Sequence, residues 1–375
     1  MRAEKGRRKL KAGSPSSTSK TLTSNSARRD ATPGEFDFIT RIRRRAERHN
    51  KLAAPVSSLI PHPSSLLHGI GDDAAVISHA ARSETVITAD LLVEDVDFRR
   101  ATMPPRALGH KALAVSLSDI AAMGARPRYA LLSVGVPAAV WRTRFLGEFY
   151  EGFFALAARA GVALVGGDVS RTPERIAVDS IVLGEVRRGR AVLRAGARPG
   201  DQIFVTGTLG GAAAGLQLLE RAPPRRRGAA ATQLVRRHQR PEPRLAWGAW
   251  LGAKRLATAM IDLSDGLSSD LTHLCRASRV GALVVAADVP VEPLINESGA
   301  ASDAALALAL HGGEDFELLF TARPEDAARL PAALDGVHVT RIGEIRPRAA
   351  GLRLHAAGRT RKLTPGGFTH FRAPR

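Results

Sequence analysis

Residues 110–136 read HKALAVSLSDIAAMGARPRYALLSVGV, and this stretch decides the fold class. Its first part has apolar residues at helical spacing, whereas the run from Tyr129 onward is short, almost continuously apolar and typical of a buried strand. Residues 145–168 repeat the same order, a helix-like stretch followed by a strand-like one. Helices that alternate with buried strands in this way predict an α/β fold, of the α+β type.

On both sides of this stretch, most of the chain shows the same two patterns, apolar residues at helical spacing and short apolar runs typical of strands. Further strands are predicted at residues 84–93, 176–186, 202–206 and 281–291. With 375 residues, the chain is long enough for two domains, each with its own core. We expect a disordered basic tail over residues 1–33, a first domain over residues 34–190 and a second domain over residues 191–375.

The composition excludes several classes of protein. Hydrophobic residues make up 44% of the chain, which favours a packed globular body. No apolar run approaches the ~20 residues that a membrane-spanning helix needs, and the basic N-terminus lacks the apolar core of a secretory signal. Cys275 is the only cysteine, which excludes an internal disulfide and a cysteine zinc cluster and predicts a cytoplasmic protein.

The formal net charge of +19 has four interpretations: nucleic-acid binding, a membrane surface, an anionic substrate, or an arginine-rich composition with solvated basic faces. Nucleic-acid modules usually cluster basic residues and interleave aromatic rings for stacking. Here the basic residues are scattered and aromatic residues make up only 5%. The composition therefore predicts no specific nucleic-acid partner, and a protein that binds nucleic acid through its basic tail and surface remains the alternative from another class.

Acidic residues stand beside glycines or at the ends of apolar runs in six places. They are Asp72 with Asp73, Asp90 with Glu94 and Asp95, Asp119, Asp168, Asp262 with Asp265 and Asp270, and Glu314 with Asp315. A single such acid is usually a turn or helix-cap residue, and we interpret Asp95 as a surface acid and Asp270 as a helix residue. So many carboxylates beside buried segments are costly unless a metal pairs with them. Oxygen ligands without cysteine or histidine spacing predict magnesium rather than zinc.

Residues 207–215, GTLGGAAAG, look like a nucleotide loop but lack the P-loop lysine and the dinucleotide-binding spacing. Close packing explains these glycines equally well. A nucleotide site in this chain must therefore neutralise phosphate through metals and arginines. Covalent catalysis has no motif to support it, because GxSxG is absent and Cys275 lies within a predicted helix, where a packed thiol is expected.

Six blocks of this sequence resemble, in order and at similar spacing, the thiamine-monophosphate kinase family of the aminoimidazole ribonucleotide synthetase-like ATP-binding superfamily. The blocks are GEFDFI, GIGDDAAV, KALAVSLSDIAAMGA, GGDVSRTP, IDLSDGLSSDL and GGEDFELLF, and the resemblance runs from Gly34 to Phe371. It implies an N-terminal mixed-sheet domain for dimerisation and ATP binding, a C-terminal α/β domain, and a homodimer. The implied reaction is transfer of the ATP γ-phosphoryl group to thiamine monophosphate, with several magnesium ions.

The resemblance also assigns site residues at the matching positions. Magnesium is implied at Asp73, Thr88, Ala89, Asp90, Asp119, Asp168, Asp262 and Asp265. ATP contacts are implied at Tyr150, Gly167, Asp168, Arg194 and Ser264, and substrate contacts at Asp97, Glu314 and Phe368. No side chain is expected to act as a nucleophile or base, because the attacking phosphate oxygen is already anionic and the carboxylates form a metal scaffold.

Three positions depart from the family pattern. Ala89 replaces a hydroxyl residue, Ser116 stands where an asparagine is common, and Asp97 replaces a histidine expected near the substrate phosphate. An acid at position 97 would repel an anion unless a metal or arginine lies between them. These departures leave two alternatives open: another ATP-using enzyme of the same superfamily, or a non-catalytic nucleotide-binding paralogue.

Overall fold

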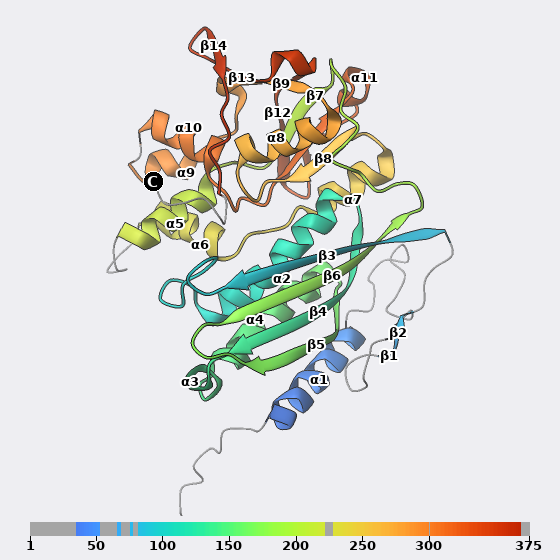
Figure 1. Ribbon diagram of the computed structural model, residues 1–375, viewed down its shortest axis with the longest axis vertical. Coiled ribbons are helices and arrows are strands. Elements are labelled where there is room, and N and C mark those ends of the chain that lie inside the picture. The colour runs from blue at the N-terminus through green and yellow to red at the C-terminus, as the bar shows by residue number, and fades with distance from the viewer. Residues whose placement is uncertain are drawn as a thin grey trace, which may run out of the picture.

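The computed structural model describes residues 35–52, 66–68, 76–77, 82–221, 228–299 and 301–368. Within them, two large β-sheets occupy different halves of the molecule and pack against helices, which confirms the predicted mixed α/β class (Figure 1). The first of these sheets ends at Arg187 and the second begins at Gln202. The proposed domain boundary near residue 190 falls between them, and the predicted tail lies outside the described residues.

The first large sheet is a mixed sheet in the order β3-β6-β4-β5. Its strands are β3 (Ser83–Val93), β4 (Arg126–Val136), β5 (Ala163–Arg171) and β6 (Ala177–Arg187). β4 and β5 run parallel, whereas the other neighbours are antiparallel. A separate short pair joins β1 (Leu66–His68) and β2 (Val76–Ile77).

Helix α2 (Pro105–Ala122) lies at the centre of the molecule, and 15 of its 18 residues are buried. Its small and apolar residues surround the whole helix, as expected for a helix packed on every side. It packs against the first sheet, against α4 (Phe145–Ala160), and against the α7 and β8 segments of the second half. The remaining helices of the first half are α1 (Glu35–Leu52) and α3 (Ala138–Trp141).

Two glycines allow α2 and α4 to approach closely. A Cβ atom at Gly109 would lie 1.8 Å from the carbonyl oxygen of Phe149, and one at Gly152 would lie 1.8 Å from that of Arg106. Any larger residue at either position would force the helices apart. This packing fixes α2 in place, and α2 in turn positions the site described below.

The second large sheet has the strand order β14-β13-β9-β12-β7-β10-β8, with β11 attached to β12. Its strands are β7 (Gln202–Thr206), β8 (Ala259–Asp262), β9 (Gly281–Val285), β10 (Leu318–Ala322), β11 (Ala333–Leu334), β12 (Val337–Arg346), β13 (Leu352–Ala356) and β14 (Arg359–Lys362). The helices are α5 (Gly211–Arg221), α6 (Ala229–Gln239), α7 (Leu245–Lys254), α8 (Leu267–Ser278), α9 (Pro293–Glu297), α10 (Ser302–His311) and α11 (Pro324–Ala327).

Most predicted strands are confirmed, with one difference. The strand predicted over residues 281–291 ends at Val285, because a short 3-10 helix (Ala286–Asp288) follows it. Cys275 is buried in α8, and burial raises the pKa of its thiol to about 12, so it is packed rather than reactive, as predicted. Among the described helices, none combines the length and apolar character needed to span a membrane.

Candidate active site

Two serines of α2 each hold a carboxylate from a different sheet, the half-buried Asp90 and the buried Asp262. Ser116 Oγ donates a hydrogen bond to Asp90 Oδ2 at 2.7 Å, and Asp90 lies on β3 of the first sheet. Ser118 Oγ donates to Asp262 Oδ2 at 2.8 Å, and Asp262 is the last residue of β8 in the second sheet. One rigid helix therefore brings together two acids that are far apart in the sequence.

A third acid, Asp119, follows on the same helix. Its Oδ2 atom accepts a hydrogen bond from Thr88 Oγ1. Residues two apart on a strand point to the same face, so Thr88 and Asp90 both face α2. Four of the predicted metal residues, Thr88, Asp90, Asp119 and Asp262, thus come together in the structure.

The three carboxylates repel one another in a buried setting. Burial, together with the charge of Asp119, raises the pKa of Asp90 to about 6. Burial, together with the charges of Asp119 and Asp90, raises the pKa of Asp262 to about 7. Burial also raises the pKa of Asp119. A divalent cation bound here would favour the ionised forms and relieve this repulsion.

This donor set fits magnesium. Mg²⁺ prefers oxygen ligands and retains several waters, so it needs only one or two carboxylates together with substrate phosphates. Over the described ranges, no three Asp, Glu, His or Cys side chains form a ready-made metal cage. Asp73, another predicted magnesium residue, lies outside the described residues.

Arg194 supplies positive charge beside these acids. It is exposed in the connection between the two sheets, where Ser278 Oγ donates to its carbonyl oxygen at 2.9 Å. Its charge lowers the pKa of Asp119 and of Asp262, opposing the larger effect of burial. The predicted nucleotide arginine is therefore within electrostatic reach of the carboxylates, a position suited to a polyphosphate.

The turn after β8 carries Ser264 and Asp265, and a buried acid shapes it. Asp270 Oδ2 accepts the backbone N–H groups of Asp265 at 3.1 Å and of Gly266 at 3.0 Å. Burial, with the charges of Asp262 and Asp265, raises the pKa of Asp270 to about 8. Asp270 is a helix residue, as predicted, in the first turn of α8, and its side chain also holds the turn that presents the predicted site residues.

Two of the three predicted substrate residues, Glu314 and Phe368, meet on that same turn. The Glu314 N–H donates to the Ser264 carbonyl oxygen at 2.8 Å, and the Phe368 N–H donates to the Asp265 carbonyl oxygen at 3.3 Å. The Phe368 side chain is 50% exposed. Predicted metal, nucleotide and substrate residues thus share one turn at the end of β8.

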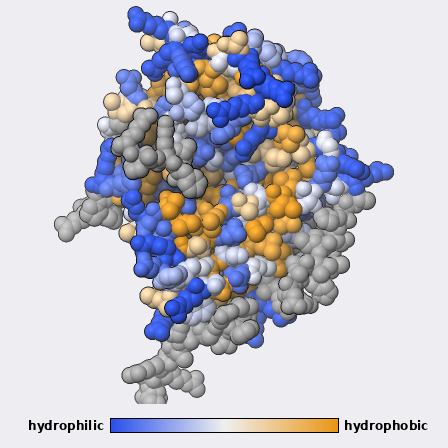
Figure 2. Space-filling view, viewed as in Figure 1, coloured by the Kyte–Doolittle hydropathy of each residue, from blue (hydrophilic) through white to orange (hydrophobic). Residues whose placement is uncertain are grey.

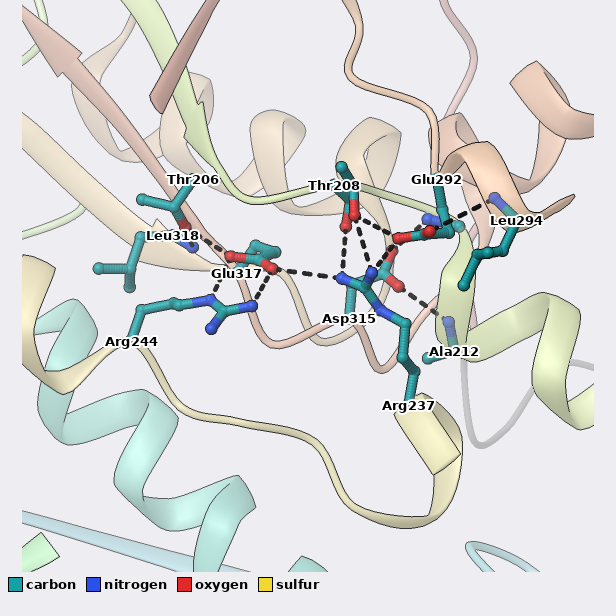
Figure 3. A network of polar contacts seen from close by, with 11 residues as sticks. Thr206, Thr208, Ala212, Arg237, Arg244, Glu292, Leu294, Asp315, Glu317 and Leu318 are labelled. Atoms are coloured by element: carbon teal, nitrogen blue, oxygen red, sulfur yellow. Dashed lines mark hydrogen bonds and ion pairs between the residues drawn. The ribbon is translucent and has the colours of Figure 1, made fainter. Parts of the chain in front are cut away.

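The glycine-rich loop at residues 207–215 is part of a polar network (Figure 3). Asp315 accepts the N–H groups of Gly210 at 2.6 Å and Ala212 at 3.1 Å, so a carboxylate already occupies the start of α5. Fully buried Glu317 accepts from Arg244 Nε at 2.5 Å. Acidic side chains of the protein itself therefore hold this loop. In this arrangement the N–H groups of Gly210 and Ala212 already donate to Asp315 and are not available to a phosphate.

Gly167 and Asp168 lie on β5, away from the carboxylate cluster. Gly167 has a φ of +145°, and a Cβ there would lie 2.0 Å from the Leu132 carbonyl oxygen. The strand register aligns Gly167 with Leu132 and Asp90, and therefore places Asp168, the next residue, on the opposite face of the sheet. The Ala89 side chain also points to that opposite face. Of Ala89, only backbone atoms could therefore contribute to the site around Asp90.

Two further predicted residues lie elsewhere. Tyr150 is buried in an aromatic cluster with Phe38, Phe149 and Phe154 in the core of the first half. Its side chain therefore supports the core and is not presented to the carboxylates. Asp97 closes the turn after β3, where its Oδ2 atom accepts the Val93 N–H at 2.8 Å. Asp95 forms an exposed ion pair with Arg175 at 2.6 Å, as expected of a surface acid.

Sequence reasoning missed Ser118, Lys111 and His238, and it missed the contacts that Asp270 makes with the turn. Ser118 carried no signal, because serines are common in helices. Lys111 did carry one: it is a lysine inside a helix whose other residues predict burial on every side. In the structure its ammonium group pairs with Glu314, which His238 also contacts.

Comparison with known proteins agrees with this architecture. Residues 71–186 match the N-terminal domain of AIR synthase related proteins, and residues 198–353 match their C-terminal domain. The chain therefore belongs to the class of AIR synthase related proteins, which combine these two domains. A crystal structure of thiamine-monophosphate kinase from Stenotrophomonas maltophilia K279a is similar, with a TM-score of 0.74 and 36% identity over 86% of this chain and 96% of that one.

Further relatives narrow the class to one family. Thiamine-monophosphate kinase from Bacillus subtilis (strain 168) is 36% identical over 318 residues, which cover 83% of this chain and 95% of the relative. A structure of AaThiL complexed with AMPPCP and TMP has a TM-score of 0.69 and 30% identity, and the match covers 90% of this chain and 97% of that one. The chain belongs to the thiamine-monophosphate kinase family.

Proposed function

We propose that this chain transfers the γ-phosphoryl group of ATP to thiamine monophosphate and so forms thiamine diphosphate. The observation that carries the proposal is the convergence of Asp90, Asp119 and Asp262 on α2, beside Arg194. Family membership supports the reaction, and so does the relative complexed with AMPPCP, an ATP analogue, and TMP. The family relationship also favours this reaction over nucleic-acid binding.

The reaction is an in-line displacement. A phosphate oxygen of thiamine monophosphate attacks the γ-phosphorus of ATP, the bond from that phosphorus to the β–γ bridging oxygen breaks, and ADP leaves. Bound magnesium ions would neutralise the polyphosphate charge. Asp90, Asp119 and Asp262 would hold those ions, and Arg194 would contribute a fixed positive charge. No general base is required, so these carboxylates position charge rather than accept protons.

The substrate's heterocycle would lie near Glu314 and Phe368. Their backbones are fixed on the turn at Ser264 and Asp265, beside the carboxylates. An exposed aromatic ring can stack on a flat heterocycle. The Asp97 carboxylate accepts the Val93 N–H, which orients its charge without removing it, so a metal or arginine would have to lie between Asp97 and the substrate phosphate.

The direct test is purified protein incubated with ATP, magnesium and thiamine monophosphate, followed by chromatography. We expect equal amounts of ADP and thiamine diphosphate. Thiamine, which lacks the acceptor phosphate, should give no product and serves as the control substrate. ADP formed without thiamine diphosphate would point instead to another ATP-using member of the superfamily, and binding of ATP without turnover would point to a non-catalytic paralogue.

We further propose that two copies associate through the exposed face of the first sheet. Helices α2 and α4 cover one face of this sheet, whereas apolar side chains gather on the other (Figures 1 and 2). On β3, Ile87 is 65% and Leu91 58% exposed, and Leu131 and Leu183 lie on the neighbouring strands. A monomer rarely exposes such a continuous apolar surface.

Leu91→Asp is expected to convert this dimer to a monomer. Twofold symmetry places the substitution at the interface twice, so dimerisation should weaken by at least about 100-fold. Sedimentation velocity measures the change, and circular dichroism should show an unchanged fold because Leu91 is exposed. Leu216→Asp, at an exposed apolar residue of α5, is the matched control and should leave the assembly unchanged. A Leu91→Asp protein that still sediments as a dimer would exclude this face.

The domain limits, the cytoplasmic location and the absence of a specific nucleic-acid partner remain predictions from the sequence. The buried, unreactive Cys275 is compatible with a reducing compartment. The AIR synthase related matches to residues 71–186 and 198–353 are compatible with the proposed boundary.

A further inference from the structure

Lys111 is a buried lysine in the middle of α2. Its side chain is 0% exposed, and its Nζ atom lies 2.5 Å from Glu314 Oε1. Burying an ammonium group is strongly unfavourable unless an opposite charge pairs with it. An apolar residue would pack in this helix at no such penalty, so packing alone does not explain a lysine here.

Its partner Glu314 lies in a loop with unusual backbone geometry. Glu314 has a φ of 69° and Phe316 a φ of 50°, and left-handed conformations of this kind are uncommon for residues other than glycine. Such geometry persists only where surrounding contacts enforce it. Three acids of this loop have separate anchors: Glu314 contacts Lys111, Asp315 accepts from the start of α5, and Glu317 pairs with Arg244.

Both carboxylate oxygens of Glu314 have cationic or polar neighbours. Oε1 faces Lys111, and Oε2 lies 2.8 Å from His238 Nδ1. Burial alone would raise the pKa of Glu314, but Lys111 and His238 outweigh it and lower that pKa to about 2. The side chain is still 29% exposed, and each carboxylate oxygen can accept more than one hydrogen bond. An ionised, oriented acceptor is therefore available to a ligand.

The same face of α2 also supports the metal side of the site. Lys111 and Ser118 are seven residues apart, which is two helical turns, so both point toward the second half of the molecule. Ser118 holds Asp262, and Lys111 holds Glu314. One helix face thus fixes the loop of the predicted metal residues and the loop of the predicted substrate residue.

We propose that Lys111 is a positioning residue, which holds Glu314 as an ionised carboxylate directed at the cationic heterocycle of thiamine monophosphate. This inference rests on the proposed function, because that function supplies the substrate. Lys111 acts only through Glu314 and does not itself contact the substrate. Loss of Lys111 leaves the Glu314 carboxylate without its main counter-ion, so the acid would take up a proton or change orientation.

The test is calorimetric binding, which does not require turnover. For Lys111→Met we expect the Kd for thiamine monophosphate to rise at least about tenfold, while the Kd for magnesium with a non-hydrolysable ATP analogue stays within about twofold. Arg159→Met is the matched control, because it removes an exposed ion pair with Glu242 (2.8 Å) that joins the same two halves. Both dissociation constants should be unchanged in that variant. Equal losses of both affinities in Lys111→Met would show a merely structural role and overturn the proposal.

A second comparison separates positioning from direct contact and does not depend on the single variant folding. Glu314→Gln and the double variant Lys111→Met/Glu314→Gln should bind thiamine monophosphate equally, within about twofold, because Lys111 has no carboxylate left to hold. A further tenfold loss in the double variant would overturn the proposal. Wild-type protein that binds thiamine monophosphate without forming product would refute the proposed function alone, whereas absence of binding would refute both.

Discussion

Asp262→Asn is expected to lower kcat at least about 100-fold while leaving the metal-free protein as stable as the wild type, or more stable. Asparagine preserves the shape of the side chain and can still accept the Ser118 hydrogen bond. It cannot supply the negative charge that the proposed magnesium scaffold needs. Removing that charge also relieves the burial of an ionised group and the repulsion from Asp119 and Asp90, which together raise the pKa of Asp262 to about 7 in the wild type.

This prediction is specific because kcat should fall while the stability of the metal-free protein should stay the same or rise. Kinetics with saturating ATP and thiamine monophosphate measure kcat, and thermal unfolding in the presence of a chelator measures stability. Asp119→Asn should behave similarly, because the charge of Asp119 raises the pKa of both other acids more than any other charge does. Asp288→Asn, at an exposed acid, is the control and should change neither quantity. Near-normal turnover by Asp262→Asn would remove this residue from the metal scaffold.

The sequence predicted the fold well because its signals were local. Periodicity located the strands at residues 84–93 and 202–206, and the structure has β3 at Ser83–Val93 and β7 at Gln202–Thr206. The strand predicted over residues 281–291 was too long, because apolar residues continue beyond Val285 into the 3-10 helix. Strand order depends on contacts between distant segments, and no local pattern encodes the placement of β8 at one end of the second sheet.

The candidate site was only partly predictable, because residue type indicates a chemistry but not a direction. Asp90 and Asp168 both follow apolar residues on strands, yet only Asp90 faces α2. Tyr150 resembled a nucleotide contact in sequence, but its helix turns it into the aromatic core. The pairing of Lys111 with Glu314 joins segments some two hundred positions apart, so only the folded chain shows it.

Metal-free protein is expected to lose stability at the carboxylate cluster as the pH rises, and magnesium is expected to restore it. Folding raises the pKa of both acids above the value of 3.8 that each has in the unfolded chain. Their contribution to the stability of the folded state is therefore fully present only below pH 3.8, where both acids are protonated. That contribution is lost as the pH rises through about 6 for Asp90 and about 7 for Asp262. Added magnesium should therefore raise the Tm at pH 8.5 by at least about 3 °C, or about 1 kcal/mol, and by less at pH 5.5.

Comparison with Asp262→Asn isolates the cluster from other titrating groups. Burial lowers the pKa of His110 and of His311, so these groups destabilise the folded state toward acid pH and oppose the carboxylates. The difference in Tm between the variant and the wild type removes their contribution, because both proteins contain them. In chelator this difference should favour the variant at both pH values, and by more at pH 8.5 than at pH 5.5, because the penalty on the wild type accumulates from the unfolded pKa of 3.8 up to the folded pKa of about 7. Magnesium should diminish the difference by stabilising the wild type. An equal magnesium effect in both proteins, at both pH values and with sodium chloride matched for ionic strength, would mean that the ion binds elsewhere. Since Ser116 and Ser118 of α2 hold Asp90 and Asp262 close together, we expect the repulsion between these acids to contribute to the affinity of the cluster for a divalent cation.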